Sequence, residues 1–329
     1  HTSEKITDQH PVPSREFIES YSESVHGRGV LVSGLVVSAV CSDCHGAHNI
    51  RPKSEKNSSV NSANIPLTCK KCHLGIYDDY EISIHGQLWK QGIDVGPVCT
   101  TCHKSHEIKE PVSTGFRLQI SDECGGCHAA RQLTYQDTFH GQSTSLGFVQ
   151  VAKCSDCHKP HLNLPRDNPL SSIYPANLIG TCGRCHPGIG GKFVSYDPHA
   201  DPRNRDRSPL LFYVYSAMNW LLISVFGFFG LHLFLWLQRS AVAVARGEIN
   251  TRWNSGKYVL RFTVPHRVAH VAVVVSFLGL AATGLPLMYN DTGWGRFLEA
   301  ILGGVEVTRY FHRLLAVVTL GYVGLHVGY

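Results

Sequence analysis

The chain has 329 residues, carries a formal net charge of +5, and only 17% of its residues are charged. It contains 12 cysteines and 20 histidines, counts that argue against an ordinary soluble enzyme built around an apolar core. All the cysteines lie between Cys41 and Cys185, whereas four of the five tryptophans lie in the last third. The sequence therefore predicts two parts of different character.

The cysteines form six pairs, and each pair is followed directly by a histidine. This C-x-x-C-H pattern is the attachment motif of c-type haem, in which both thiols join the porphyrin and the histidine binds the iron. Zinc sites also use C-x-x-C pairs, but they do not require the histidine. The propionates of six haems would outweigh the small positive charge, so no nucleic-acid partner is expected. The motifs are Cys41, Cys44 and His45; Cys69, Cys72 and His73; Cys99, Cys102 and His103; Cys124, Cys127 and His128; Cys154, Cys157 and His158; and Cys182, Cys185 and His186.

Further histidines recur at matched offsets from these motifs. Each of three copies, which start 59 and 55 residues apart, has a His-Gly pair, a motif with another histidine three residues on, and a second motif. Each copy is thus a two-haem unit. These histidines are candidate second (distal) axial ligands, which would give low-spin iron suited to electron transfer. They are His26, His48, His85, His106, His140, His161 and His199.

The spacing leaves two pairings open. In the first, favoured by a resemblance in motif style to small cytochromes of sulfate and metal reducers, each His-Gly histidine serves the haem that follows it. His48, His106 and His161 then serve the next haem along, and His199 is spare. In the second, each His-Gly histidine serves the preceding haem, and His26 is spare.

The last part of the chain has long runs without charge, at residues 208–238, 268–290 and 314–329. Runs of this kind predict transmembrane helices, here at about 210–238, 266–290 and 308–329. The loop between the first two is basic, with Arg239, Arg246, Arg252, Lys257, Arg261 and Arg267 against one acid, Glu248. The positive-inside rule places this loop in the cytoplasm, and hence the cysteine-rich part in the periplasm of a bacterial inner membrane.

Histidines within these apolar segments are candidate haem b ligands, because ionisable residues there are usually functional. His312 and His326 are 14 residues apart, which puts them on nearly the same helix face and about 21 Å apart. The candidates are His270, His312, His326 and His232, whereas His266 reads as an interfacial residue.

The segment Arg261–His270 (RFTVPHRVAH), followed by Thr283-Gly284-Leu285, resembles the first helix of the cytochrome b subunits of formate dehydrogenases and nickel–iron hydrogenases. Residues 308–313 (TRYFHR) resemble the start of their second helix. The resemblance covers about 70 residues and implies one or two b haems, ligated by His270 and His312, and electron exchange with membrane quinone. The whole chain resembles fusions of a multihaem cytochrome c with such a cytochrome b.

These observations predict a mainly α-helical chain with much irregular loop: a periplasmic hexahaem domain at residues 1–200, a linker at 201–209 and a transmembrane cytochrome b domain at 210–329. We expect electron transfer between quinol and a periplasmic cytochrome or redox enzyme, with outward flow favoured. One alternative is the membrane subunit of a periplasmic hydrogenase or dehydrogenase. A catalytic multihaem reductase is less favoured, because the many distal candidates leave no reason to expect an open haem. Of the four candidate haem b ligands, only His312 is expected near the periplasmic surface of the membrane. We therefore also expect a further helix, beyond Tyr329 or in another subunit, that carries a histidine at the same depth.

Overall fold

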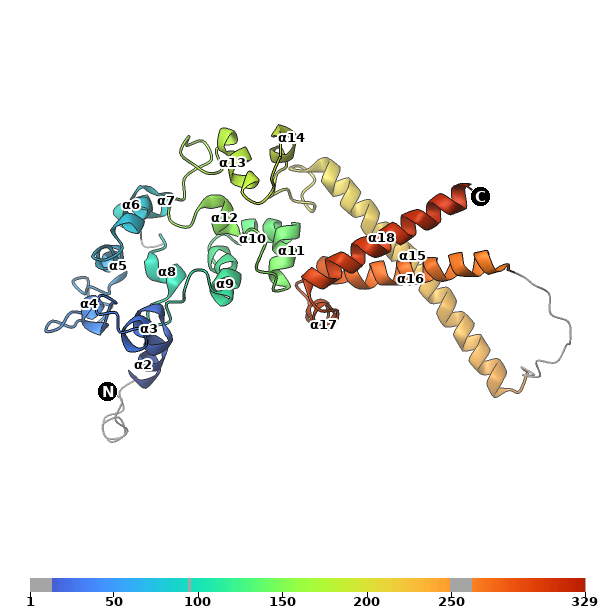
Figure 1. Cartoon of the computed structure of the whole chain (residues 1–329), viewed down its shortest axis with the longest axis horizontal. Coiled ribbons are helices and arrows are strands. Elements are labelled where there is room, and N and C mark those ends of the chain that lie inside the picture. The colour runs from blue at the N-terminus through green and yellow to red at the C-terminus, as the bar shows by residue number, and fades with distance from the viewer. Residues whose placement is uncertain (1–13, 94–95, 249–261, 329) are drawn as a thin grey trace. The chain divides into compact units, whose positions relative to one another are not determined.

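A computed structural model describes residues 14–93, 96–248 and 262–328, and within these ranges the chain is mainly helical and has no β-strand. The chain divides into two compact units, residues 1–197 and residues 198–329 (Figure 1). The first unit holds every C-x-x-C-H motif, and the second holds the three long helices.

The first unit consists of short helices joined by turns. Its helices are α2 (Ser14–Glu23), α3 (Val25–Leu31), α4 (Cys41–His45), η1 (Ser62–Asn64), α5 (Ile65–Lys70), α6 (Leu74–Ile82), α7 (Ile84–Lys90), α8 (Cys99–His103), α9 (Thr114–Gly125), α10 (Ala129–Gln136), α11 (Phe139–Ser145), α12 (Cys154–His158), η2 (Pro175–Asn177), α13 (Leu178–Gly183) and α14 (Gly191–Val194).

This unit has almost no apolar core of its own. Among its described residues, the buried hydrophobic side chains are Ile65, Tyr77, Tyr80 and Val98, and most other buried side chains are serine or threonine. Isolated helices of this length are not stable in water, so something other than packing between apolar side chains must hold them. The prediction of much irregular loop fits this architecture.

The second unit contains α15 (Pro209–Ala245), α16 (Val264–Met288), α17 (Gly293–Ile301) and α18 (Val305–Gly328). Three of them, α15, α16 and α18, are long and apolar enough to cross a membrane, which confirms the predicted number of spans. α15 continues beyond the predicted end at residue 238 and stops before Gly247, which adopts a φ of 68°. The basic-loop residues Arg252, Lys257 and Arg261 lie outside the described residues, as does Tyr329.

α16 and α18 pack closely along a strip of small residues on α16. Ser276 and Thr283 are buried, and a Cβ at Gly279 would lie 2.5 Å from Leu315 Cδ1 of α18. Residues 276, 279 and 283 follow the three- and four-residue spacing of one helix face. Small residues allow this approach, as is common where helices associate in membranes.

α17 was not anticipated from the sequence. It connects α16 to α18, and its buried Glu299 accepts a hydrogen bond of 2.6 Å from Thr308 Oγ1 of α18. This bond fixes the first turn of α18 at Thr308, four residues before His312.

Substituting Gly279 with isoleucine should force the two helices apart. Overpacking of a close contact costs about 1–3 kcal/mol, and we expect a lower thermal unfolding midpoint in detergent. The matched control is Gly324→Ile on α18, where a Cβ would meet nothing within 4 Å. Equal midpoints for the two variants would contradict the observed packing.

Candidate haem-binding sites

The first motif of each repeat forms a five-residue helix of its own: α4, α8 or α12. The residue before the first cysteine donates its backbone N–H to the side chain of the residue directly before the second cysteine. The distances are 2.8 Å for Val40 to Asp43, 3.1 Å for Val98 to Thr101, and 2.8 Å for Lys153 to Asp156. The backbone N–H of the accepting residue in turn donates to the carbonyl of the residue before the first cysteine. These bonds satisfy backbone groups at the start of a helix that is too short to be stable alone.

The second motif of each repeat begins in the last turn of a longer helix instead. Cys69, Cys124 and Cys182 lie near the ends of α5, α9 and α13, and the motif histidine follows in the next turn. In these motifs lysine, glycine and arginine replace the capping residue directly before the second cysteine. The two motif types thus differ in local structure as well as in sequence.

The second cysteine also differs in exposure between the two motif types. In each second motif it is exposed, at Cys72, Cys127 and Cys185, whereas its counterpart in each first motif is partly buried. The motif alone did not distinguish these cysteines, because the segment that contacts Cys44, at Ser59, lies 15 residues further along the chain. Thioether attachment of haem through Cys72, as through the other motif cysteines, stays a prediction.

The His-Gly pairs belong to a longer pattern, Tyr-x-x-Ser/Thr-x-His-Gly, that the sequence analysis did not recognise. The tyrosine hydroxyl donates to the carbonyl two residues before the next motif, from Tyr21 to Ala39, Tyr80 to Pro97 and Tyr135 to Ala152, over 2.9–3.0 Å. The side chain of the serine or threonine accepts a bond from the glycine N–H and starts the helix that carries the histidine. A search for residues repeated five and two positions before each histidine would have found both.

Only glycine fits at its position in this pattern, because there is no room for a side chain. A Cβ at Gly27, Gly86 or Gly141 would lie 1.9, 2.0 or 2.2 Å from the carbonyl oxygen of the tyrosine in the same pattern. That atom belongs to the backbone, so a side chain could be accommodated only by moving the helix start. The distal histidine, one residue before the glycine, would move with it.

Five motif histidines face a distal candidate histidine. Their ring centroids are 6.1 Å apart in four pairs and 6.3 Å apart in the fifth. The pairs are His26–His73, His45–His106, His85–His128, His103–His161 and His140–His186.

The observed pairing is regular, and it differs from both pairings that the spacing left open. Each His-Gly histidine faces the second motif of its own repeat, rather than the motif immediately before or after it. The histidine three residues after a first motif reaches back to the first motif of the preceding repeat, as His106 does to His45. The contacts span 43 to 61 residues of sequence, so spacing alone could not rank them.

Backbone hydrogen bonds join successive repeats beside these contacts. The N–H of Val25 donates to Ile108 O at 2.9 Å, and that of Ile84 donates to Asn163 O at 2.8 Å. Ile108 and Asn163 each lie two residues after a distal histidine, His106 and His161. The junction between the first and second repeats therefore has the same contacts as the junction between the second and third.

The pairs have the geometry that a haem iron requires. Two imidazoles on opposite faces of one metal, with metal–nitrogen bonds of about 2 Å, have ring centroids about 6 Å apart. Rings in direct stacking contact would be closer. The residues present therefore fit haem bound by two histidines, and the cysteines beside them would provide the thioether links.

The thiols of consecutive motifs lie near one another along the whole unit. A hydrogen bond to Cys99 raises the pKa of the Cys69 thiol, and one to Cys124 lowers the pKa of Cys154 to about 7. The nearby thiols of Cys69, Cys127 and Cys182 also raise the pKa values of Cys44, Cys102 and Cys157, respectively, after the larger effect of burial. All 12 cysteines are free in the structure. Haems attached at these positions would follow one another in chain order.

Burial lowers the pKa values of six of the ten paired histidines, and in five of these six the second histidine of the pair lowers the value further. A neutral imidazole retains the lone pair that a metal ligand needs. The affected residues are His26, His85, His103, His106, His140 and His161.

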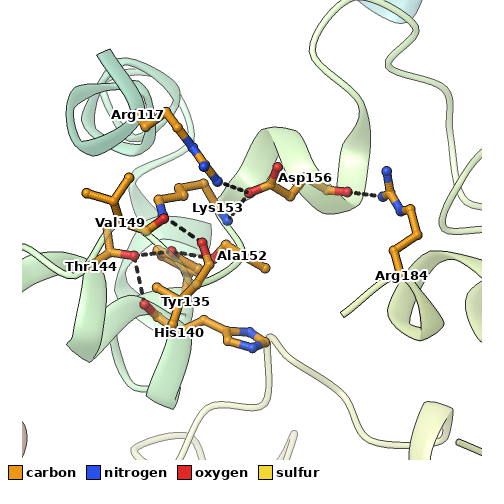
Figure 2. A network of polar contacts seen from close by, with 10 residues as sticks. Arg117, Tyr135, His140, Thr144, Val149, Ala152, Lys153, Asp156 and Arg184 are labelled. Atoms are coloured by element: carbon orange, nitrogen blue, oxygen red, sulfur yellow. Dashed lines mark hydrogen bonds and ion pairs between the residues drawn. The ribbon is translucent and has the colours of Figure 1, made fainter. Parts of the chain in front are cut away.

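In the third repeat, a polar network fixes the start of α12 (Figure 2). Lys153 is buried, and its ammonium group donates to the carbonyls of Val149 and Val151. Burial lowers the pKa of Lys153 to about 8. Asp156 caps the helix and lies 3.9 Å from Arg117 of α9. Valine occupies the position of Lys153 in the other two repeats.

Two distal candidates remain outside the five pairs. His48 is exposed, and its nearest motif neighbour in sequence, His45, already faces His106. His199 and His158, the one motif histidine outside the five pairs, each have contacts in the structure. The distal assignment of these two candidates stays a prediction.

In the second unit, His312 of α18 contacts α16 directly. Its Nδ1 lies 2.8 Å from Thr283 Oγ1, while Thr283 Oγ1 also lies 2.7 Å from Gly279 O. When the single hydroxyl proton of Thr283 goes to Gly279 O, which can only accept, Thr283 Oγ1 accepts from Nδ1–H of His312. This assignment leaves Nε2 without a proton, which is the tautomer that binds a metal.

The other membrane histidines lie apart from His312. His270 is 13 residues before Thr283 and His326 is 14 residues after His312, so in the antiparallel pair both lie about 20 Å from the Thr283–His312 contact, towards the same end. His326 stacks on Tyr322 at 5.8 Å, and His232 and His270 are exposed. Haem b ligation by these residues stays a prediction.

No family model, curated protein or solved structure matches this chain. Within the described residues, no three histidine, cysteine or acidic side chains are grouped to hold a metal ion directly. A haem iron needs only two protein ligands. The case for haem therefore rests on the paired histidines and the motif cysteines.

Substituting Gly86 with alanine should move the start of α7 and draw His85 away from His128. We expect one ferric haem to become high-spin and the stability to fall by about 1–3 kcal/mol. The control is Gly115→Ala, because a Cβ there meets nothing within 4 Å. Electron paramagnetic resonance of both variants, with spin counted per polypeptide, measures the effect. An unchanged spectrum for the Gly86 variant would contradict the role of this glycine.

Thr283 should set the tautomer and ring orientation of His312. In Thr283→Val the Nδ1–H group loses its acceptor, and we expect a shifted b haem potential and an altered low-spin signal. Thr283→Ser keeps the hydroxyl and should restore both. If valine and serine have the same effect, Thr283 contributes packing only.

Proposed function

We propose that this chain carries electrons between membrane quinol and a periplasmic acceptor, through haem b in its second unit and six c haems in its first. The observation that carries the proposal is the set of five facing histidine pairs with centroids 6.1–6.3 Å apart. Each pair joins a histidine of a C-x-x-C-H motif to one from elsewhere in the chain. Haem held in this way would supply a one-electron redox centre without an open coordination position.

The residues of the chain would hold and space these centres. Cysteines of consecutive motifs lie side by side, which supports a continuous row of six haems in sequence order. By order along the chain, His199 would serve the haem at Cys154, because the first-motif haems of the first two repeats also take their distal ligand from the chain that follows. Two ligands per iron favour electron transfer over substrate reduction.

Three helices able to cross a membrane support the proposed exchange of electrons with membrane quinone. His312 is held with Nε2 available, at the end of α18 near α17. Its position in the TRYFHR segment fits the resemblance to cytochrome b subunits that exchange electrons with quinone. The positive-inside rule and the extracytoplasmic attachment of c haem both favour the inner membrane, with the first unit in the periplasm. Outward flow, from quinol to a periplasmic cytochrome or redox enzyme, is the favoured direction.

Substituting His106 with methionine should raise the reduction potential of one haem and leave the other five nearly unchanged, because a methionine ligand favours reduced iron. The pairing with His45 assigns that haem to Cys41 and Cys44. The shift should disappear when Cys41 and Cys44 are alanine, and persist when Cys124 and Cys127 are alanine. Spectroelectrochemical titration of the purified protein decides between the two haems, and the opposite pattern would refute the pairing.

A menaquinol analogue mixed anaerobically with the oxidised protein should reduce b haem before c haem. In His312→Ala we expect less b haem absorbance and slow reduction of c haem by quinol. Dithionite, which can reach the c haems directly, should still reduce them fully. Quinol reduction of c haem at the unmodified rate in this variant would exclude His312 from the path.

A further inference from the structure

His48 is the distal candidate whose place in the repeat is clear but which, within the described part of the chain, belongs to none of the five facing pairs. It lies three residues after His45, just as His161 lies three residues after His158. His161 is partly buried against His103, whereas His48 is exposed. A lone exposed histidine is ordinarily a surface residue, so the case for His48 depends on the structure around it.

That local structure is the same in the first and third repeats, at a constant offset of 113 residues. Ser59 and Ser172 donate to Cys44 O and Cys157 O at 2.5 and 2.6 Å. The matching threonines, Thr68 and Thr181, donate to the carbonyls of these serines, each at 2.7 Å. Asn64 and Asn177 likewise donate to the carbonyls of Ser58 and Ser171, each at 2.8 Å. The scaffold that presents His161 therefore also presents His48.

The role of a histidine three residues after a first motif is seen where the second repeat contacts the first and where the third contacts the second. His106 and His161 each reach the first motif of the preceding repeat, and the carbonyl two residues later accepts a backbone bond from that repeat. In the first repeat the corresponding residues are His48 and Ile50, and the Ile50 side chain is 67% exposed. The surface that the second and third repeats use to bind their predecessors is thus present on the first repeat.

We propose that His48 is the distal ligand of a further c-type haem, one that none of the six motifs carries. This haem would belong to a two-haem unit docked on the first repeat through the same junction that joins the described repeats. The inference rests on the proposed haem ligation. The unit can belong to another part of the same polypeptide or to a partner polypeptide, since either presents the same chemistry, an iron with one vacant axial position.

The test uses protein isolated from its native membranes together with any polypeptides that remain bound to it. His48→Ala should convert one additional haem per complex to the high-spin ferric state, as counted by electron paramagnetic resonance against total haem. The matched control, His106→Ala, should convert one haem as well. The His48 effect should persist when Cys154 and Cys157 are alanine, because it does not involve the haem whose distal ligand is assigned to His199.

The outcomes separate the alternatives. No change in His48→Ala, with the expected change in His106→Ala, overturns the inference and leaves the proposed function intact. Loss of the His48 effect in the Cys154/Cys157 background also overturns it, because His48 would then serve that haem. No change in either histidine variant refutes the haem ligation on which both rest. Where the effect is present, haem staining after denaturing electrophoresis assigns the extra haem to this polypeptide or to a partner.

Discussion

The first unit depends on pairs of imidazoles held about 6 Å apart by segments far from each other in sequence. A domain of this size normally folds around an apolar core, but here only a few hydrophobic side chains among the described residues are buried. Porphyrins attached at the motifs would contribute the missing apolar surface, and iron bound by two histidines would cross-link the helices. In that case folding and cofactor attachment are one process.

Short polar contacts hold the distal histidines in the positions that this cross-linking would need. The tyrosine and the helix-starting serine or threonine hold each distal histidine, and the glycine lets its helix start pack against the tyrosine carbonyl. Each group is small, but the arrangement occurs three times with nearly equal distances. Repetition produces order in a unit that lacks a large core, because successive repeats are joined by equivalent contacts.

The membrane unit follows different physics. Its helices expose large apolar side chains, as expected of surfaces in contact with lipid, and pack through small residues where α16 meets α18. Within this contact, Thr283 is both part of the packing and the acceptor for His312. A threonine at this point therefore connects helix association with the orientation of a candidate ligand.

The sequence by itself determined the C-x-x-C-H motifs, the repeat and the three long apolar helices, because each depends on residues close together in the chain. It did not determine which histidines face each other. Both pairings inferred from spacing joined neighbouring motifs, whereas the structure brings His45 to His106 and His103 to His161, across the junction between repeats. Those contacts depend on where turns such as Gly46 and backbone bonds such as Val25 to Ile108 direct the chain. Such long-range placement is a property of the tertiary structure, and so is the contact of His312 with a hydroxyl 29 residues away on another helix.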